Sequence, residues 1–183
     1  MSAGILVAHG FELDAAAAAL AQCVAPPGRM QVIRTEGQPT AIVDFAHTPD
    51  ALQKALLSAR EHSSGKLWVI FGCGGDRDRG KRAQMGVAAA RFADRVVVTS
   101  DNPRHENPQK IVEDICSGIA QTDNVCVETD RRSAIRTALD TAAIDDVVLI
   151  AGKGSESYQI IGDDRIPMSD IAIVAEHLQG ASS

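Results

Sequence analysis

Residues 95–104 read RVVVTSDNPR, and this stretch decides the fold of the chain. Its apolar half is typical of a short buried strand. The proline forces the residue before it out of the helical region. The polar residues Asp101, Asn102 and Arg104 are therefore presented on a turn at the carboxyl end of a strand. Open α/β sheets bind their ligands at that edge.

The three side chains of this turn suit an amino acid as ligand. Arg104 offers a planar fork of donors for a carboxylate, and Asn102 offers both a donor and an acceptor. Asp101 offers a negative charge for an ammonium group. The alternative is an Asx-Pro turn whose side chains cap the following helix. The motif alone leaves both interpretations open.

Apolar runs and helical patterns alternate on both sides of this stretch. We expect strands at Gln31–Arg34, Ala41–Phe45, Leu67–Phe71, Arg95–Thr99, Val125–Val127 and Val147–Ala151. Helices are expected at Pro49–His62, Lys81–Phe92, Pro108–Ala120 and Arg131–Ala142. Tyr158–Ile161 and Arg165–Met168 predict a hairpin before a last helix at Ser169–Leu178. The pattern predicts an α/β fold: a Rossmann-like, doubly wound, mostly parallel sheet with a C-terminal hairpin.

The first 27 residues do not fit this alternation. Glu12–Val24 predicts one helix, which Pro26, Pro27 and Gly28 stop, and Ile5–Val7 is a further apolar piece. These elements are too few to bury a core. We expect residues 1–27 to be the tail of a preceding domain plus a linker. Residues 28–183 are expected to form the domain in which strands and helices alternate.

Composition excludes several classes of function. The 183 residues include 24 acidic and 18 basic side chains, a net charge of −6, with no basic cluster that would suit a nucleic acid. No apolar stretch approaches the roughly 20 residues that cross a bilayer, and no secretion signal begins the chain. We expect a cytoplasmic protein that contacts neither nucleic acid nor membrane. The four cysteines form no CxxC pair, and no metal site is expected.

Two further turns follow predicted strands. In DFAHTPD, residues 44–50, Thr48 and Pro49 predict a helix start, and Asp44 and His47 are expected to face outward toward a ligand. In GKGSE, residues 152–156, glycines such as Gly152 let the backbone approach a ligand, and Glu156 suits an ammonium group. The Gly-Lys-Gly sequence itself is typical of a surface loop.

The turn after Phe71 partly matches a phosphate-binding loop. Gly75 through Lys81 fits G-x-x-x-x-G-K between a strand and a helix, but Arg82 follows where a hydroxyl residue should hold magnesium. A glycine-permitted turn that displays Arg77 toward an anionic ligand is the preferred interpretation. Upstream, Arg29 lies at the expected domain joint, where a phosphate clamp and a solvated hinge charge both remain open.

Five motifs in order, GRM, DFAHTPDAL, FGCGGDRDRGKR, DNPR and AGKGSESYQ, resemble the C-terminal portion of the Mur ligases, and most closely the members that add meso-diaminopimelate. The resemblance implies a C-terminal amino-acid-binding domain behind a central ATPase domain. It implies ATP-facing roles for Arg29, Asp44 and His47. It implies meso-diaminopimelate contacts for Arg77, Asp101, Asn102, Arg104, Gly152 and Glu156. The family usually has histidine at Ser155 and tyrosine at Phe45.

By this resemblance, the whole enzyme would be an ATP-dependent amide ligase of peptidoglycan synthesis. It would add meso-diaminopimelate to UDP-N-acetylmuramoyl-L-alanyl-D-glutamate. ATP, magnesium and the UDP-muramoyl dipeptide would be held through domains outside this chain. This chain alone is then expected to be inactive, with no catalytic residue and no bound cofactor of its own. The alternatives are a non-catalytic small-ligand-binding module and a free-standing P-loop nucleotide-binding protein.

Overall fold

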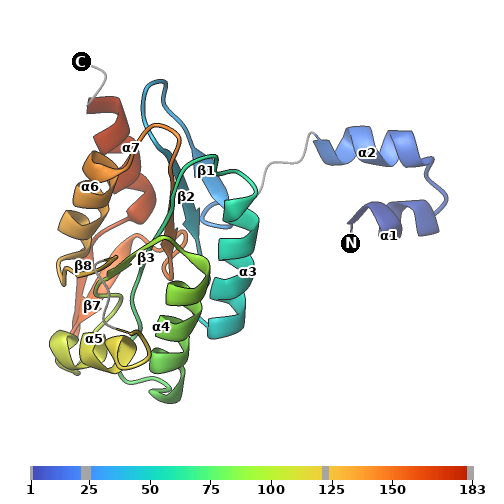
Figure 1. The fold of residues 1–183 in the computed structure, drawn as a ribbon. Coiled ribbons are helices and arrows are strands. Elements are labelled where there is room, and N and C mark those ends of the chain that lie inside the picture. Colours follow the sequence, from blue (N-terminus) through green and yellow to red (C-terminus); the bar gives the residue numbers. More distant parts are fainter. Residues whose placement is uncertain (1, 22–25, 121–123, 181–183) are drawn as a thin grey trace.

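The computed structural model describes residues 2–21, 26–120 and 124–180. Within these ranges, six strands form one sheet in the order β1-β2-β6-β3-β4-β5 (Figure 1). The strands are β1 (Gln31–Ile33), β2 (Thr40–Asp44), β3 (Leu67–Phe71), β4 (Arg95–Val98), β5 (Val125–Val127) and β6 (Val147–Ala151). All neighbours pair in parallel except β1, which runs antiparallel to β2. The predicted doubly wound, mostly parallel sheet is confirmed.

Helices cover both faces of the sheet. On one face lie α3 (Pro49–Arg60), α4 (Gly80–Phe92) and α5 (Pro108–Cys116), and on the other α6 (Arg131–Thr141) and α7 (Asp170–Gly180) (Figure 1). Alternate residues of β6 enter the two cores: Leu149 packs with the first helices and Ile150 with the second. A strand buried on both faces reads as a continuous apolar run, which explains why the sequence pattern was clear.

The predicted C-terminal hairpin is also confirmed. It consists of β7 (Tyr158–Ile161) and β8 (Asp164–Pro167), which pair antiparallel. Arg104 forms an isolated bridge with Ile161, so the hairpin is attached to the turn that follows β4. Further hydrogen bonds from Gln159 and Ile160 to residues 101 and 102 hold the hairpin against that turn.

The helix starts follow local capping chemistry. Thr48 accepts a hydrogen bond from the Ala51 amide at the start of α3, as predicted, and Asn107 accepts one from the Gln109 amide at the start of α5. The turn of residues 101–104 does not cap α5, so the helix-capping interpretation of that turn is wrong.

The N-terminal segment holds two helices where the sequence predicted one. The apolar piece Ile5–Val7 lies inside helix α1 (Ser2–Ala8), and α2 is Leu13–Ala21, whose predicted continuation to Val24 lies outside the described residues. The two helices contact each other and stand apart from the sheet in Figure 1. Several large apolar side chains are exposed there, namely Ile5, Val7, Phe11 and Leu13.

Candidate functional site: a polar cavity at the strand ends

A cavity of about 330 Å³ lies at the carboxyl ends of the central strands. Its lining includes seven of the nine predicted site residues: His47, Arg77, Asp101, Asn102, Arg104, Gly152 and Glu156. These residues come from the turns after β2, β3, β4 and β6, which the sheet order places side by side. The sheet topology therefore brings these four turns together at one edge, as the sequence predicted.

Arg104 is held in an unusual backbone conformation. Its φ is +51°, in the left-handed region that bulky residues rarely adopt. The Arg104 amide donates to the Ile160 carbonyl, and the Arg104 carbonyl accepts from Gly162, so the hairpin holds this conformation from both sides. The side chain is half-buried, and its Nη1 donates to the Gly75 carbonyl at 2.9 Å. The guanidinium is thereby aimed into the cavity.

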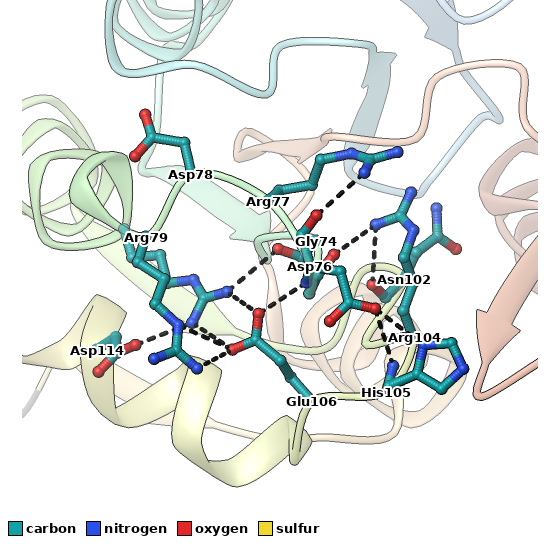
Figure 2. A network of polar contacts seen from close by, with 12 residues as sticks. Gly74, Asp76, Arg77, Asp78, Arg79, Asn102, Arg104, His105, Glu106 and Asp114 are labelled. Atoms are coloured by element: carbon teal, nitrogen blue, oxygen red, sulfur yellow. Dashed lines mark hydrogen bonds and ion pairs between the residues drawn. The ribbon is translucent and has the colours of Figure 1, made fainter.

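Arg77 reaches the same cavity from the turn after β3 (Figure 2). Its Nη1 donates to the Asp76 carbonyl at 3.0 Å. A side chain at Gly74 would lie 2.8 Å from Nη1 of Arg104 and 3.7 Å from Cγ of Arg77. The approach of Gly74 to the Arg104 guanidinium is thus close, and that to Arg77 is an ordinary contact. Two arginines lining one cavity suit a ligand with an anionic group.

Asn102 lies almost fully buried at the centre of the site and uses both ends of its amide. Its Oδ1 accepts from Nζ of Lys153 at 2.9 Å and from the Ile160 amide at 2.9 Å. Its Nδ2 donates to Oε2 of Glu156 at 3.0 Å. Asn102 therefore links the turn after β4 to the turn after β6 and to the hairpin.

Lys153 lies in the interior, although the Gly-Lys-Gly sequence is typical of a surface loop. Its side chain has no exposed surface, and its ammonium donates to Asn102 and to Oε2 of Glu156. The glycines on both sides adopt positive φ, +118° at Gly152 and +55° at Gly154, and this lets the chain turn inward. The sequence contains these glycines but gives no signal for the partners of the amine.

Gly152 and Asp101 approach each other closely. A Cβ at Gly152 would lie 2.8 Å from Oδ2 of Asp101, and the Gly152 amide donates to the Asp44 carbonyl. The predicted close approach of backbone at Gly152 is therefore to Asp101 and to the end of β2.

Asp44 does not face outward, which corrects the prediction for this residue. It is 9% exposed, and its carboxylate accepts from the Met30 amide and from the Ala46 amide, each at 2.8 Å. An isolated strand-end aspartate offers no sequence signal for partners 14 residues upstream. The Asp44 carboxylate therefore connects the backbone at Met30 to the end of β2.

His47 and Arg29 lie on either side of Phe45. His47 lines the cavity, with Nδ1 2.8 Å from the Phe45 carbonyl, and its own carbonyl accepts from Lys81. The Arg29 guanidinium stacks over the Phe45 ring at 4.4 Å and is not among the lining residues. The predicted ATP-facing roles of these two residues stay predictions.

The turn of residues 75–81 uses three of its backbone amides within the protein. A phosphate-binding loop needs such amides free. Gly75 donates to the Asn102 carbonyl, Asp76 to the Glu106 carboxylate and Gly80 to the Asp78 carboxylate. These contacts count against the free-standing P-loop interpretation. Arg77 lines the cavity, and its display toward an anionic ligand stays a prediction.

Arg82 is a fully buried cation with a structural role. The sequence indicated only that this residue does not fit a P-loop. Its guanidinium binds Glu106 through two nitrogens at 2.8 and 3.0 Å and Asp114 at 2.9 Å. Hydrogen bonds from Arg82 and Arg79 lower the pKa of Glu106 to about 2. Glu106 also accepts from the Asp76 amide, so one carboxylate ties the turns after β3 and β4 together.

A second set of hydrogen bonds, at the surface, joins the same two turns. His105 lies with Nδ1 3.0 Å from Asp76 and Nε2 3.1 Å from Asp163 of the hairpin. Hydrogen bonding to Asp76, and then to Asp163, raises the pKa of His105, and the same contact lowers the pKa of Asp76. The loops that carry Arg77 and Arg104 are therefore linked twice.

Other parts of the described chain carry less chemistry. A larger cavity of about 540 Å³ beside β5 and α6, lined by Trp68, Val97 and Ala138 among others, contains none of the predicted site residues. Burial raises the pKa of the Cys73 thiol to about 12, so Cys73 is not a ready nucleophile. Within residues 2–21, 26–120 and 124–180, no helix is both long and apolar enough for a bilayer, and no cluster of acidic, histidine and cysteine side chains could hold a metal ion.

The fold is a doubly wound α/β domain, and the polar cavity at its strand ends is lined by side chains of both charges. Residues 28–154 match the family model described as Mur ligase, glutamate ligase domain. The chain is 52% identical over 158 residues to UDP-N-acetylmuramoyl-L-alanyl-D-glutamate–2,6-diaminopimelate ligase of Coxiella burnetii, a match covering 86% of this chain and 32% of that protein. This chain belongs to the Mur ligase family.

Solved structures agree with the family assignment. A structure of a UDP-N-acetylmuramoyl-L-alanyl-D-glutamate–2,6-diaminopimelate ligase is 41% identical with a TM-score of 0.82, covering 99% of this chain and 37% of the other. Folylpolyglutamate synthase of Mycobacterium tuberculosis, solved with ADP and AMPPCP, is 26% identical with a TM-score of 0.56, covering 78% and 33%. The chain spans about a third of the length of the relatives it matches.

Proposed function

We propose that this chain is the amino-acid-binding domain of an ATP-dependent ligase that adds meso-diaminopimelate to UDP-N-acetylmuramoyl-L-alanyl-D-glutamate in the cytoplasm. The observation that carries the proposal is the cavity, in which Arg77 and Arg104 share a space with Asp101 and Glu156. Both signs of charge within one small cavity suit a ligand that is itself zwitterionic. The named relatives support the same activity.

Diaminopimelate has two amino-acid ends, and only one of its amines reacts. The distal carboxylate suits the guanidiniums of Arg104 and Arg77, and the distal ammonium suits Glu156. The distal end would then be held in the cavity while the reacting amine points out of it. In the complete ligase, domain closure would bring that amine to an acyl phosphate, and orientation of this kind contributes about 7–11 kcal/mol in favourable cases.

ATP and its magnesium ion would be held mainly by a preceding central domain. We propose that residues 1–27 are the end of that domain and its linker, since α1 and α2 expose apolar side chains that a larger domain would cover. Arg29 and His47 would face the nucleotide from this side. Asp44 would contribute indirectly, because its carboxylate holds the backbone beside Arg29 through the Met30 amide.

Arg104→Ala in the complete ligase tests the proposal. It should raise the KM for meso-diaminopimelate about a hundredfold and leave the KM for ATP nearly unchanged, because two charged hydrogen bonds of about 1.5–3 kcal/mol each are lost. Arg104→Lys should restore little, since an ammonium cannot reproduce a planar fork. Steady-state kinetics with each substrate varied in turn measures both constants.

The matched control is Arg91→Ala, which removes an exposed arginine from the last turn of α4. This variant should leave all Michaelis constants as they are. If Arg104→Ala changes the dependence on ATP and on diaminopimelate equally, or changes neither, the cavity is not the diaminopimelate site.

A further inference from the structure

Lys153 places a positive charge in the interior of the domain, where an ionised side chain is costly unless it is fully paired. Its ammonium lies 2.9 Å from Oδ1 of Asn102 and 2.8 Å from Oε2 of Glu156, and Nδ2 of Asn102 lies 3.0 Å from that same Glu156 oxygen. The three side chains therefore form a closed ring in which each member contacts the other two. Lys153 is not among the residues that line the cavity, whereas Asn102 and Glu156 are.

The ring fixes which end of the Asn102 amide meets a ligand. A carbonyl oxygen has two lone pairs, and those of Asn102 are used by Lys153 and by the Ile160 amide. Lys153 is a donor only, so it cannot accept from the amide nitrogen if the group is turned around. Asn102 is therefore left with an N–H, and no acceptor, to offer a ligand.

The ring also fixes the Glu156 carboxylate. Its Oε2 accepts from both Lys153 and Asn102, which leaves Oε1 as the oxygen available to a bound ammonium group. Without Lys153, the carboxylate would lose a charged partner and would be free to turn. The orientation of the two ligand-facing groups thus depends on a side chain behind them.

We infer that Lys153 is a positioning residue for amino-acid recognition: it holds Glu156 and Asn102 in the orientation that receives the distal ammonium of the incoming diamino acid. The inference rests on the proposed function. It deepens that function by assigning selectivity for the distal amine to a buried lysine that touches no ligand.

The test compares two ligands in the complete ligase. One is meso-diaminopimelate and the other is (S)-2-aminopimelate, which keeps the reacting amine and the distal carboxylate but lacks the distal amine. Lys153→Met keeps an apolar stem and removes the donors. It should raise the KM for diaminopimelate about tenfold or more, the size of one charged hydrogen bond, and change the KM, or the inhibition constant, for aminopimelate less than about threefold.

Lys110→Met, which removes an exposed lysine from α5, is the matched control and should change neither constant. A purely structural role for Lys153 would raise both constants by the same factor, and that result, or no change in either, overturns the inference. A wild-type ligase that does not use diaminopimelate would overturn the proposed function instead, and the inference with it.

The double variant Lys153→Met with Glu156→Gln guards against a single variant that fails to fold, because it removes both charges of the buried pair. If Lys153 acts through Glu156, the double variant should differ from Glu156→Gln alone by less than about threefold in either constant. A KM for diaminopimelate that is about tenfold or more above that of Glu156→Gln alone would show that Lys153 acts by another route, and the inference is then wrong.

Discussion

Gly28 has no side chain because the loop after β6 leaves no room for one. A Cβ at this position would lie 2.1 Å from the Ser155 amide nitrogen and 2.3 Å from the Gly154 carbonyl carbon. The first residue of the domain is thereby pressed against the loop that carries Glu156. Its φ of +68° is a second reason for glycine.

Replacing Gly28 with alanine should destabilise the chain more than the same change at Gly37. Gly37 has a similar φ of +76° but nothing within 4 Å of its Cβ position, so Gly37→Ala should cost only about 1–2 kcal/mol for the left-handed backbone. Gly28→Ala adds a collision with backbone that must move. Urea unfolding measures both, and equal losses would show that the contact with Ser155 yields easily.

For single residues, the sequence predicted the charged side chains that line the cavity. It did not predict the side chains that contact and orient them. Arg77, Arg104 and Glu156 lie on turns after strands, and that position follows from local pattern alone. Asp44 was expected to face outward because its partner, the Met30 amide, lies 14 residues away. The contact of Lys153 with Asn102 was not predicted, because 51 residues separate the two. No local pattern encodes such a partner.

Between elements, Glu106 is the junction that joins the turn after β3 to the turn after β4. Its carboxylate binds Arg82 and Arg79 of the α4 start and the Asp76 amide, and its pKa is about 2 instead of about 4.5. A depressed pKa in the folded state means that the ionised form stabilises the fold. That stabilisation is present above pH 4.5 and is lost as the pH falls toward 2.

Glu106→Gln should therefore lower the free energy of unfolding at neutral pH, and its deficit relative to wild type should shrink as the pH falls below about 4.5. Urea unfolding at a series of pH values measures the deficit. Glu113→Gln, an exposed position on α5, should show no deficit at any pH. A deficit for Glu106→Gln that stays constant down to pH 2 would mean that the charge of Glu106 does not tie the turns.

The elements themselves were largely predictable. The four inner strands β2, β6, β3 and β4 are apolar runs that are mostly buried on both faces. Thr48 with Pro49 marks the start of α3 by a local cap. The helix α1 was missed because its seven residues contain neither a cap nor a clear apolar stripe to distinguish it from a loose apolar segment. The ends of two helices were overestimated by a few residues: α3 was expected to reach His62 and ends at Arg60, and α5 was expected to reach Ala120 and ends at Cys116.

Across the whole molecule, α1 and α2 contact each other and lie apart from the sheet domain (Figure 1). Removing residues 1–27 should therefore change the melting temperature of the sheet domain by less than about 2 °C. The fluorescence of Trp68, which packs against one of the two cores, reports unfolding of the sheet directly. A larger drop would show that the first 27 residues belong to the same cooperative unit, contrary to the proposed domain boundary.

The position of β6 between β2 and β3 affects how the domain folds during its synthesis. Strands β2 and β3 are adjacent in the chain but not in the sheet, because β6 pairs with both of them. During translation, β2 and β3 cannot form their hydrogen bonds with β6 until residues 147–151 have been synthesised. Contacts of such long sequence separation slow folding. Until β6 has been synthesised, the backbone groups at the edges of β2 and β3 stay unpaired and open to other chains. This domain should therefore depend on chaperones during synthesis more than a helical bundle of its size.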